Sequence, residues 1–282
     1  MTDKRHSMSA KLAPQIAFLG AGNMASAMIS GLITEGFSPS QLRASDPSEA
    51  ALARLQECGL TRLGTAPDEI FEGADLVVAA VKPQIIPGAL ASIKGQLGPD
   101  SALLSIAAGI PIASLQSHVG PDVSVIRCMP NTPAMLGLGA SALFAADTVS
   151  APQRALAEQV TNAAGTTVWV ASETLLDTVT AVSGSGPAYF FALIEAIARA
   201  GTELGLDEDV SMALTIQTAL GAAALAQQSS EGVATLRENV TSPGGTTEQA
   251  LQSLQNSQFD AVVAEAVRQC AARARTLGEE FG

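Results

Sequence analysis

The chain has 282 residues, enough for two compact domains, and its 47% hydrophobic and 15% charged residues are typical of a well-buried globular protein. A formal net charge of −12, without any cluster of Lys or Arg, argues against nucleic-acid binding. The three cysteines, Cys58, Cys128 and Cys270, are widely separated and form no CxxC pair, so we expect reduced thiols in a cytoplasmic protein and no metal site.

The first 13 residues are polar and lack the apolar core of a signal peptide, so we expect a flexible tail there. Beyond them, charged or polar residues interrupt every apolar run before it reaches the roughly 18 to 20 residues that a membrane span needs. The sequence therefore predicts a soluble protein with no membrane partner.

The stretch 16–31, IAFLGAGNMASAMISG, reads as a buried strand, a glycine-rich turn and the start of a helix. Four apolar residues, 16–19, suit a central parallel strand buried on both faces. The turn then has the pattern GxGxxA. In it, Gly20 permits a tight turn, Gly22 lets the backbone approach a pyrophosphate, and Ala25 allows the helix to pack closely on the strand.

The following helix begins near Asn23 and Met24, and its unpaired N–H groups would face the phosphates of a dinucleotide. A second strand, 42–45, comes next. It ends at Ser45, and Asp46 follows directly. This strand–helix–strand context favours a dinucleotide site over a purely structural turn.

Short apolar runs and helical runs alternate as far as residue 171, which is typical of a doubly wound parallel sheet. The further strands are expected at 60–63, 76–81, 103–107, 123–127, 140–144 and 167–170. Ligands of such sheets lie at the carboxyl ends of the strands, so the loops there should hold the nicotinamide end of the cofactor. The candidates in these loops are Val81, Lys82, Pro83, Ala108, Gly109, Met129, Pro130 and Asn131. Ordinary turn chemistry is the alternative for each loop alone.

Beyond Glu173 strand signals vanish, and helices are expected at 189–203, 210–227, 236–240, 248–254 and 259–277. The helix 210–227 carries apolar residues on every side, so it must be buried against something. A domain of about 110 residues has a limited interior. We therefore predict packing against a second subunit, as an obligate dimer or a multiple of dimers.

Catalytic side chains of the usual kinds are scarce. Only two histidines occur, His6 in the tail and His118 at the end of an expected surface helix, which disfavours a histidine-based dehydrogenase mechanism. The stretch 183–191, SGSGPAYFF, reads as the start of a helix with Pro187 near its first turn. The chemistry must then rely on positioning and on the cofactor.

The stretch 241–249, TSPGGTTEQ, places bare backbone at Gly244 and Gly245 before a helix that starts near Thr246. Its N–H groups, with the hydroxyls of Ser242, Thr246 and Thr247, could hold a carboxylate. A capping box, T-x-x-Q with Thr246 as the cap, is an equally good explanation of the same pattern.

The motifs GAGNMA, AVKP, SIAAG, RCMPNTP, AVSGSGPAYFF and TSPGGTT, in this order and spacing, closely resemble those of pyrroline-5-carboxylate reductase over about residues 15–278. The resemblance implies hydride transfer from NAD(P)H to the imine carbon of L-1-pyrroline-5-carboxylate, giving L-proline in the last step of proline biosynthesis. It implies an N-terminal Rossmann domain, 14–171, and a helical substrate-binding and dimerisation domain, 172–282. It also implies interlocked dimers, often five of them in a decamer.

The resemblance further implies that the substrate carboxylate lies in the SPGGTT turn, at Ser242 and at the backbone N–H groups of Thr246 and Thr247, beside Gly244 and Gly245. The Thr247 hydroxyl would contact the ring nitrogen, and either it or water would relay the proton. The resemblance thus favours an anion site at this turn over a capping box at Thr246.

Asp46 departs from the pattern, because many similar reductases prefer NADPH and carry small polar residues at this point. An Asp here usually binds the ribose 2′-hydroxyl and repels a 2′-phosphate. Ser45 and the nearby Arg43 could accept the phosphate if Asp46 turns away. We expect NADPH as the cofactor, with NADH accepted.

Two alternatives stay open. One is a β-hydroxyacid or imine reductase of the same architecture; such hydroxyacid enzymes commonly use a helix lysine, and residues 173–282 contain none. The other is a nucleotide-sensing module without turnover, which would need no SPGGTT site.

Overall fold

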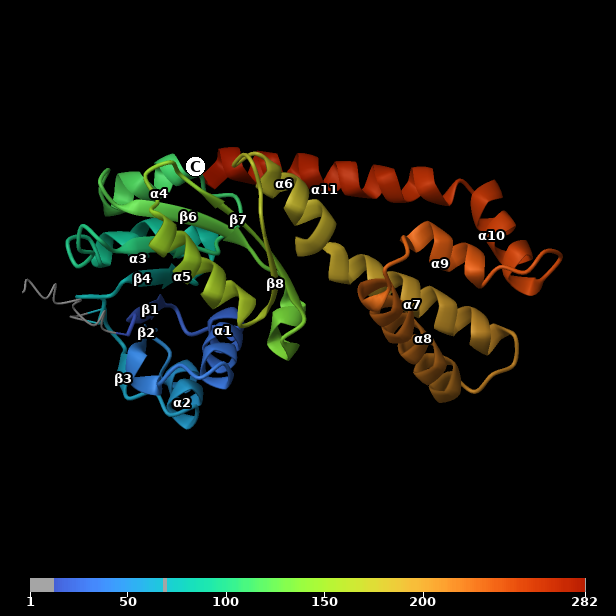
Figure 1. Cartoon of the computed structure of the whole chain (residues 1–282), viewed down its shortest axis with the longest axis horizontal. Helices are drawn as coiled ribbons and strands as arrows, with labels where there is room; N and C mark the ends of the chain where they lie inside the picture. The colour runs from blue at the N-terminus through green and yellow to red at the C-terminus, as the bar shows by residue number, and fades with distance from the viewer. Residues whose placement is uncertain (1–12, 68–69, 282) are drawn as a thin grey trace, which may run out of the picture. The chain divides into compact units, whose positions relative to one another are not determined.

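The computed structural model describes residues 13–67 and 70–281 (Figure 1). By their contacts, these residues form two compact units. The sheet unit comprises the described residues up to Gly184 together with those from Arg273 onward, and the helical unit is Ser185–Ala272. This division lies 13 residues beyond the expected 171/172 boundary. The predicted tail lies outside the described residues except for Ala13.

The sheet unit is built on eight strands in the order β3-β2-β1-β4-β5-β6-β7-β8. All neighbouring pairs are parallel except β6 with β7. Strand β1 lies between β2 and β4, so the strand order reverses beside it, where open α/β sheets bind ligands. The strands are β1 Ile16–Leu19, β2 Leu42–Ser45, β3 Arg62–Gly64, β4 Leu76–Ala79, β5 Ala102–Ser105, β6 Ser124–Met129, β7 Gly139–Ala145 and β8 Gly165–Trp169.

Helices cover both faces of this sheet. They are α1 Asn23–Thr34, α2 Glu49–Glu57, α3 Ile86–Ser92, α4 Ile112–Val119, α5 Ala151–Asn162 and α6 Leu175–Val179, with 3₁₀ turns η1 Pro39–Gln41, η2 Pro83–Ile85 and η3 Thr132–Leu136 and a π-helix, η4 Thr180–Gly184. Residues of α1, α2 and α5 join the core on one face, and residues of α3 and α4 join the core on the other.

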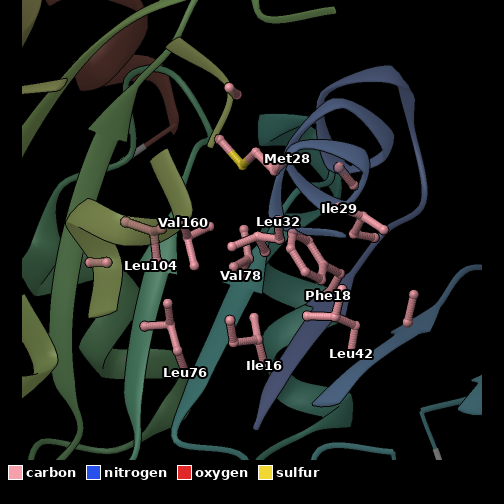
Figure 2. Packing of buried hydrophobic residues seen from close by; sticks show 14 of the residues in the cluster. Ile16, Phe18, Met28, Ile29, Leu32, Leu42, Leu76, Val78, Leu104 and Val160 are labelled. Atoms are coloured by element: carbon pink, nitrogen blue, oxygen red, sulfur yellow. The ribbon is translucent and has the colours of Figure 1, made fainter. Parts of the chain in front are cut away.

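Strand β1 contributes to both cores through its alternating side chains. Ile16 and Phe18 pack with Met28 and Leu32 of α1 (Figure 2), whereas the alternate residues of β1 belong to the opposite core. Burial on both faces is the reason why a central strand reads as an uninterrupted apolar run. The expected positions of β1 and β2 are confirmed to the residue.

The helical unit contains α7 Gly186–Glu203, α8 Glu208–Gln228, α9 Val233–Asn239, α10 Thr246–Asn256 and most of α11 Phe259–Phe281. Pro187 lies in the first turn of α7, as predicted. The helices α7 and α8 pack against each other, and the Ser211 hydroxyl of α8 donates to the Ala198 carbonyl of α7 at 2.7 Å. Many large apolar side chains of this unit remain exposed, including Phe190, Phe191, Leu214, Leu220, Leu225 and Val262.

Two segments, Leu175–Glu203 and Glu208–Gln228, are long and apolar enough to cross a membrane by length and composition alone, each with a mean hydropathy of 1.3. The sequence predicts no such segment when an uninterrupted apolar run is required, because charged or polar residues interrupt every run. One or two helices of this kind are weak evidence for a membrane span. The apolar helices of an oligomer interface have the same composition.

Candidate active site

The glycine-rich turn lies between the end of β1 and the start of α1. Gly20 has φ +101°, and a Cβ there would stand 2.8 Å from both the Ala80 carbonyl oxygen and Val81 Cγ1. The Gly20 N–H donates to the Ser45 carbonyl at 2.8 Å, which ties the turn to the end of β2. Only glycine fits this position, because both its backbone angle and its surroundings exclude a side chain.

Gly22 differs from Gly20 in its surroundings. A Cβ on Gly22 would meet no protein atom within 4 Å, so the protein itself does not require a glycine there. Gly22 is the N-cap of α1, and no side chain caps that helix. Beside it, Asn23 is exposed and Met24 half-buried. The uncapped N–H groups and the open space fit the pyrophosphate of a dinucleotide.

Asp46 follows β2 and faces this turn. Its Oδ2 accepts a hydrogen bond from the Ala21 N–H at 2.8 Å, and its Oδ1 accepts one from the Ser48 N–H at 2.8 Å. The side chain of Ser45 is buried. Neither residue therefore has the free side chain that the sequence predicted for binding the ribose or the 2′-phosphate of the cofactor.

Arg43 does not lie where it could bind a phosphate of the cofactor, so that expectation is wrong. Its side chain is 2% exposed and donates to the carbonyls of Ile70 at 3.0 Å and Glu72 at 2.8 Å. Burial, and then the neighbouring Arg62, lower the pKa of Arg43. Arg43 fixes the loop before β4, a role that local sequence cannot reveal because its partners lie 27 and 29 residues away.

The loops after β4 and β5 occupy the carboxyl edge of the sheet. After β4, Val81 and Pro83 are half-buried and Lys82 is exposed. After β5, Ala108 is half-buried and Gly109 has φ +79°. A Cβ on Gly109 would approach the Gly278 nitrogen of α11 to 3.3 Å, so this glycine also serves close packing within the sheet unit.

Strand β6 ends at Met129 and continues into a loop with Pro130 and Asn131, and the side chain of Asn131 is already hydrogen-bonded. Its Nδ2 donates to the Ser183 carbonyl at 3.0 Å, and its Oδ1 accepts from the Ala140 N–H at 2.8 Å. Asn131 thus joins the RCMPNTP motif to the π-helix η4. Both motifs are visible in the sequence, but this link is not, because nothing in their spacing indicates it.

Arg127 and Glu173 form a second link that the sequence analysis missed. Arg127 of β6 is nearly buried, and its guanidinium lies 2.8 Å from Glu173 Oε1, which also accepts from the Ile112 N–H at 2.7 Å. Nearby, burial raises the pKa of Asp177, while Arg127 and Arg275 act against that rise. An arginine inside an apolar strand was the available signal, since such a charge requires a partner.

The SPGGTT turn belongs to the helical unit and leads into α10. Gly245, not Thr246, is the N-cap, and no side chain caps the helix, so the capping box proposed for Thr246 is wrong. Instead, Glu248 Oε2 accepts a hydrogen bond from the Gly244 N–H at 2.7 Å, and Gly244 has φ +72°. The carboxylate of Glu248 thereby holds the glycine turn closed.

The N–H groups of Thr246 and Thr247 precede the first intrahelical bond of α10, from the Gln249 N–H to the Gly245 carbonyl at 3.3 Å. Ser242 and Thr246 are exposed, and Thr247 is half-buried. Orphan N–H groups beside hydroxyls form a site that suits a carboxylate. In the part of the chain that the structure describes, no group of three or more His, Cys, Asp or Glu side chains could hold a metal ion.

Two family models match the chain. Residues 173–277 match the family described as pyrroline-5-carboxylate reductase dimerisation, and residues 15–109 match the family described as NADP oxidoreductase, coenzyme F420-dependent. The chain is 45% identical over 269 residues to pyrroline-5-carboxylate reductase of Pseudomonas aeruginosa, covering 95% of this chain and 98% of the relative.

Solved structures give the same result. The chain is similar to a pyrroline-5-carboxylate reductase from Coxiella burnetii, with a TM-score of 0.90, 36% identity, and coverage of 94% of this chain and 98% of that one. It is also similar to the Plasmodium falciparum pyrroline carboxylate reductase with NADP bound, with a TM-score of 0.81, 30% identity and the same coverage.

Proposed function

The chain belongs to the pyrroline-5-carboxylate reductase family, and on that basis we propose that it reduces L-1-pyrroline-5-carboxylate to L-proline with NADPH, accepting NADH as well. The uncapped N-terminus of α10 behind Gly244 and Gly245 carries the proposal. A nucleotide sensor needs only the glycine-rich turn, whereas an enzyme acting on a carboxylated substrate also needs this second anion site.

We propose that the N–H groups of Asn23 and Met24, at the Gly20–Gly22 turn, hold the cofactor's diphosphate. The loops after β4, β5 and β6 would surround its nicotinamide end, and the contacts would come from Val81, Lys82, Pro83, Ala108, Gly109, Met129 and Pro130. When bound, the cofactor supplies a hydride from the nicotinamide C4. Asp46 supports the glycine-rich turn by accepting a hydrogen bond from the Ala21 N–H, and Asn131 supports the loop after β6 by donating one to the Ser183 carbonyl.

In the helical unit, Ser242 and the N–H groups of Thr246 and Thr247 bind the substrate carboxylate, and the bare backbone of Gly244 and Gly245 lets it approach. The Thr247 hydroxyl contacts the ring nitrogen. A protonated imine is already electrophilic, so these groups need only fix the ring and balance the carboxylate charge. The proton comes from water or from the Thr247 hydroxyl, and no strong base is required.

The assembly we propose is an interlocked homodimer formed through residues 172–282, with a decamer of five dimers as the higher form. The exposed apolar side chains of α7 and α8 support it, since a second copy would remove them from water. Residues 14–171 would carry the cofactor. We place the protein in the cytoplasm, without nucleic-acid or membrane partners.

The test is NADPH oxidation at 340 nm by purified protein with L-1-pyrroline-5-carboxylate, with proline quantified and NADH run in parallel. We expect turnover above the enzyme-free rate and one proline formed for each NADPH consumed. Folded protein that binds NADPH but turns over neither cofactor would overturn the proposal and favour a sensing role.

A further inference from the structure

Asp46 occupies the position at which the carboxylate of a Rossmann-type domain commonly hydrogen-bonds the ribose 2′-hydroxyl. Both of its oxygens, however, accept hydrogen bonds from backbone N–H groups. We propose that Asp46 is a positioning residue that holds the glycine-rich turn in shape for the cofactor's diphosphate, and that it does not choose between NADPH and NADH. This inference rests on the cofactor site of the proposed function.

Two consecutive residues at the end of β2 hold two consecutive N–H groups of the turn. The Gly20 N–H donates to the Ser45 carbonyl, and the Ala21 N–H donates to Asp46 Oδ2, both at 2.8 Å. Ala21 is completely buried, so its N–H would have no access to water if Asp46 moved away. The turn therefore depends on this carboxylate as much as on the strand.

Asp46 is itself fixed from two further sides. Its own N–H donates to the Gly64 carbonyl at the end of β3 at 3.1 Å, and its Oδ1 accepts from the Ser48 N–H at the start of α2. Hydrogen bonds to an ionised carboxylate are stronger than neutral ones. The half-buried side chain thus joins β3, α2 and the glycine-rich turn into one rigid corner.

This corner sets the direction of Gly22 and of the first N–H groups of α1, because Ala21 directly precedes Gly22. Those groups contact the diphosphate, which is the same in NADPH and NADH. A carboxylate has about four lone-pair sites, so a ribose hydroxyl could also reach Asp46. If Asp46 only holds the turn, its loss should weaken NADPH and NADH equally and leave the ratio of their Kd values unchanged. If Asp46 binds the ribose, its loss should change that ratio.

The experiment compares Asp46→Asn with Ser48→Ala. Asparagine has the same shape but keeps only one acceptor oxygen, so it cannot accept both N–H groups. Ser48→Ala removes the hydroxyl that caps α2 by accepting from the Ala51 N–H, but it leaves the Ser48 N–H and the Ala21–Asp46 bond in place. Kd values for NADPH and NADH are measured by calorimetry without substrate, and amide exchange is followed over residues 16–31.

We expect Asp46→Asn to weaken both cofactors about tenfold, to change their Kd ratio by less than twofold, and to speed exchange at the Ala21 amide. Ser48→Ala should leave both Kd values within about twofold of the wild type. A Kd ratio shifted about tenfold toward NADPH, or Kd values that both stay unchanged, would overturn the inference. If Asp46→Asn does not fold, Asp46→Glu is measured with the same criteria. Because no substrate is present, a failure of the proposed reaction leaves this result unaffected.

Discussion

The two units of the chain differ in how far they bury their own apolar side chains. In the sheet unit, Ile16 and Phe18 are fully covered by helices of the same chain. In the helical unit, Phe190 and Phe191 are each 65% exposed. A single copy thus completes the core of the sheet unit but leaves apolar surface exposed on the helical unit, and exposed apolar surface of this kind marks an interaction site.

The largest effect should come from a charge on that apolar surface. Leu220→Glu on α8 places a carboxylate where we expect a partner subunit, and burying it unpaired is costly. We expect the mass by light scattering to fall from that of a dimer or larger assembly to that of a monomer. Leu136→Glu, at an exposed leucine of the sheet unit, is the control and should keep the wild-type mass. A monomeric wild type at micromolar concentration would contradict the account.

Gly20 and Gly22 allow the second test, because the same substitution meets different surroundings in one turn. Gly20→Ala should lower the free energy of unfolding by about 2–4 kcal/mol and abolish NADPH binding, since its Cβ meets the Ala80 carbonyl. Gly22→Ala should leave Tm within about 2 °C of the wild type, yet weaken NADPH about tenfold or more. Thermal denaturation and NADPH titration check both. An equal loss of Tm in both variants would show that Gly22 serves the fold.

Thr247 and Thr246 allow a similar comparison in the helical unit. Thr247→Ala removes the hydroxyl assigned to the ring nitrogen and should lower kcat/KM about tenfold, which corresponds to about 1.4 kcal/mol of transition-state stabilisation. Thr246→Ala keeps the N–H group through which we propose that Thr246 binds the carboxylate, so its kcat/KM should stay within about twofold. If Thr247→Ala also remained within twofold, the role assigned to Thr247 would be abandoned.

The smallest effect concerns a thiol in the core of the sheet unit. Burial raises the pKa of Cys128 to about 12, against a smaller opposing effect of its hydrogen bond with Ser141. Its reactive thiolate is therefore almost absent at pH 8 and forms only as the pH approaches that value. We expect iodoacetamide to alkylate the half-buried Cys58 before Cys128, as read by mass spectrometry of the native protein. Modification of both thiols at equal rates would contradict this.

Features that depend on neighbouring residues could be predicted from the sequence. Local patterns predict the strands β1 and β2, the glycine-rich turn and the start of α7. A run of consecutive apolar residues indicates a strand buried on both faces, and glycines at fixed spacing indicate a turn that needs backbone freedom. The helix N-terminus at residue 246 also follows from local pattern, although Gly245 and not Thr246 occupies the N-cap position.

Partners far apart in the sequence could not be predicted. The hydrogen bonds of Arg43 to the loop before β4 and of Asn131 to Ser183 span 27 and 52 residues, and only the folded sheet brings those groups together. The positions of the two residues near strand ends predict a role at the cofactor instead, for Asn131 as a direct contact and for Arg43 as a phosphate ligand only if Asp46 turns away. The π-helix η4 could not be predicted for another reason, because its sequence, TAVSG, is compatible with an ordinary helix end.

Hydride transfer to the cyclic imine is tested with NADPH carrying deuterium at the nicotinamide C4 position that is transferred, with L-1-pyrroline-5-carboxylate and the wild-type protein. We expect proline that is one mass unit heavier, with the deuterium on the former imine carbon. Proline without the label, or oxidation of NADPH without proline, would contradict hydride transfer to the cyclic imine.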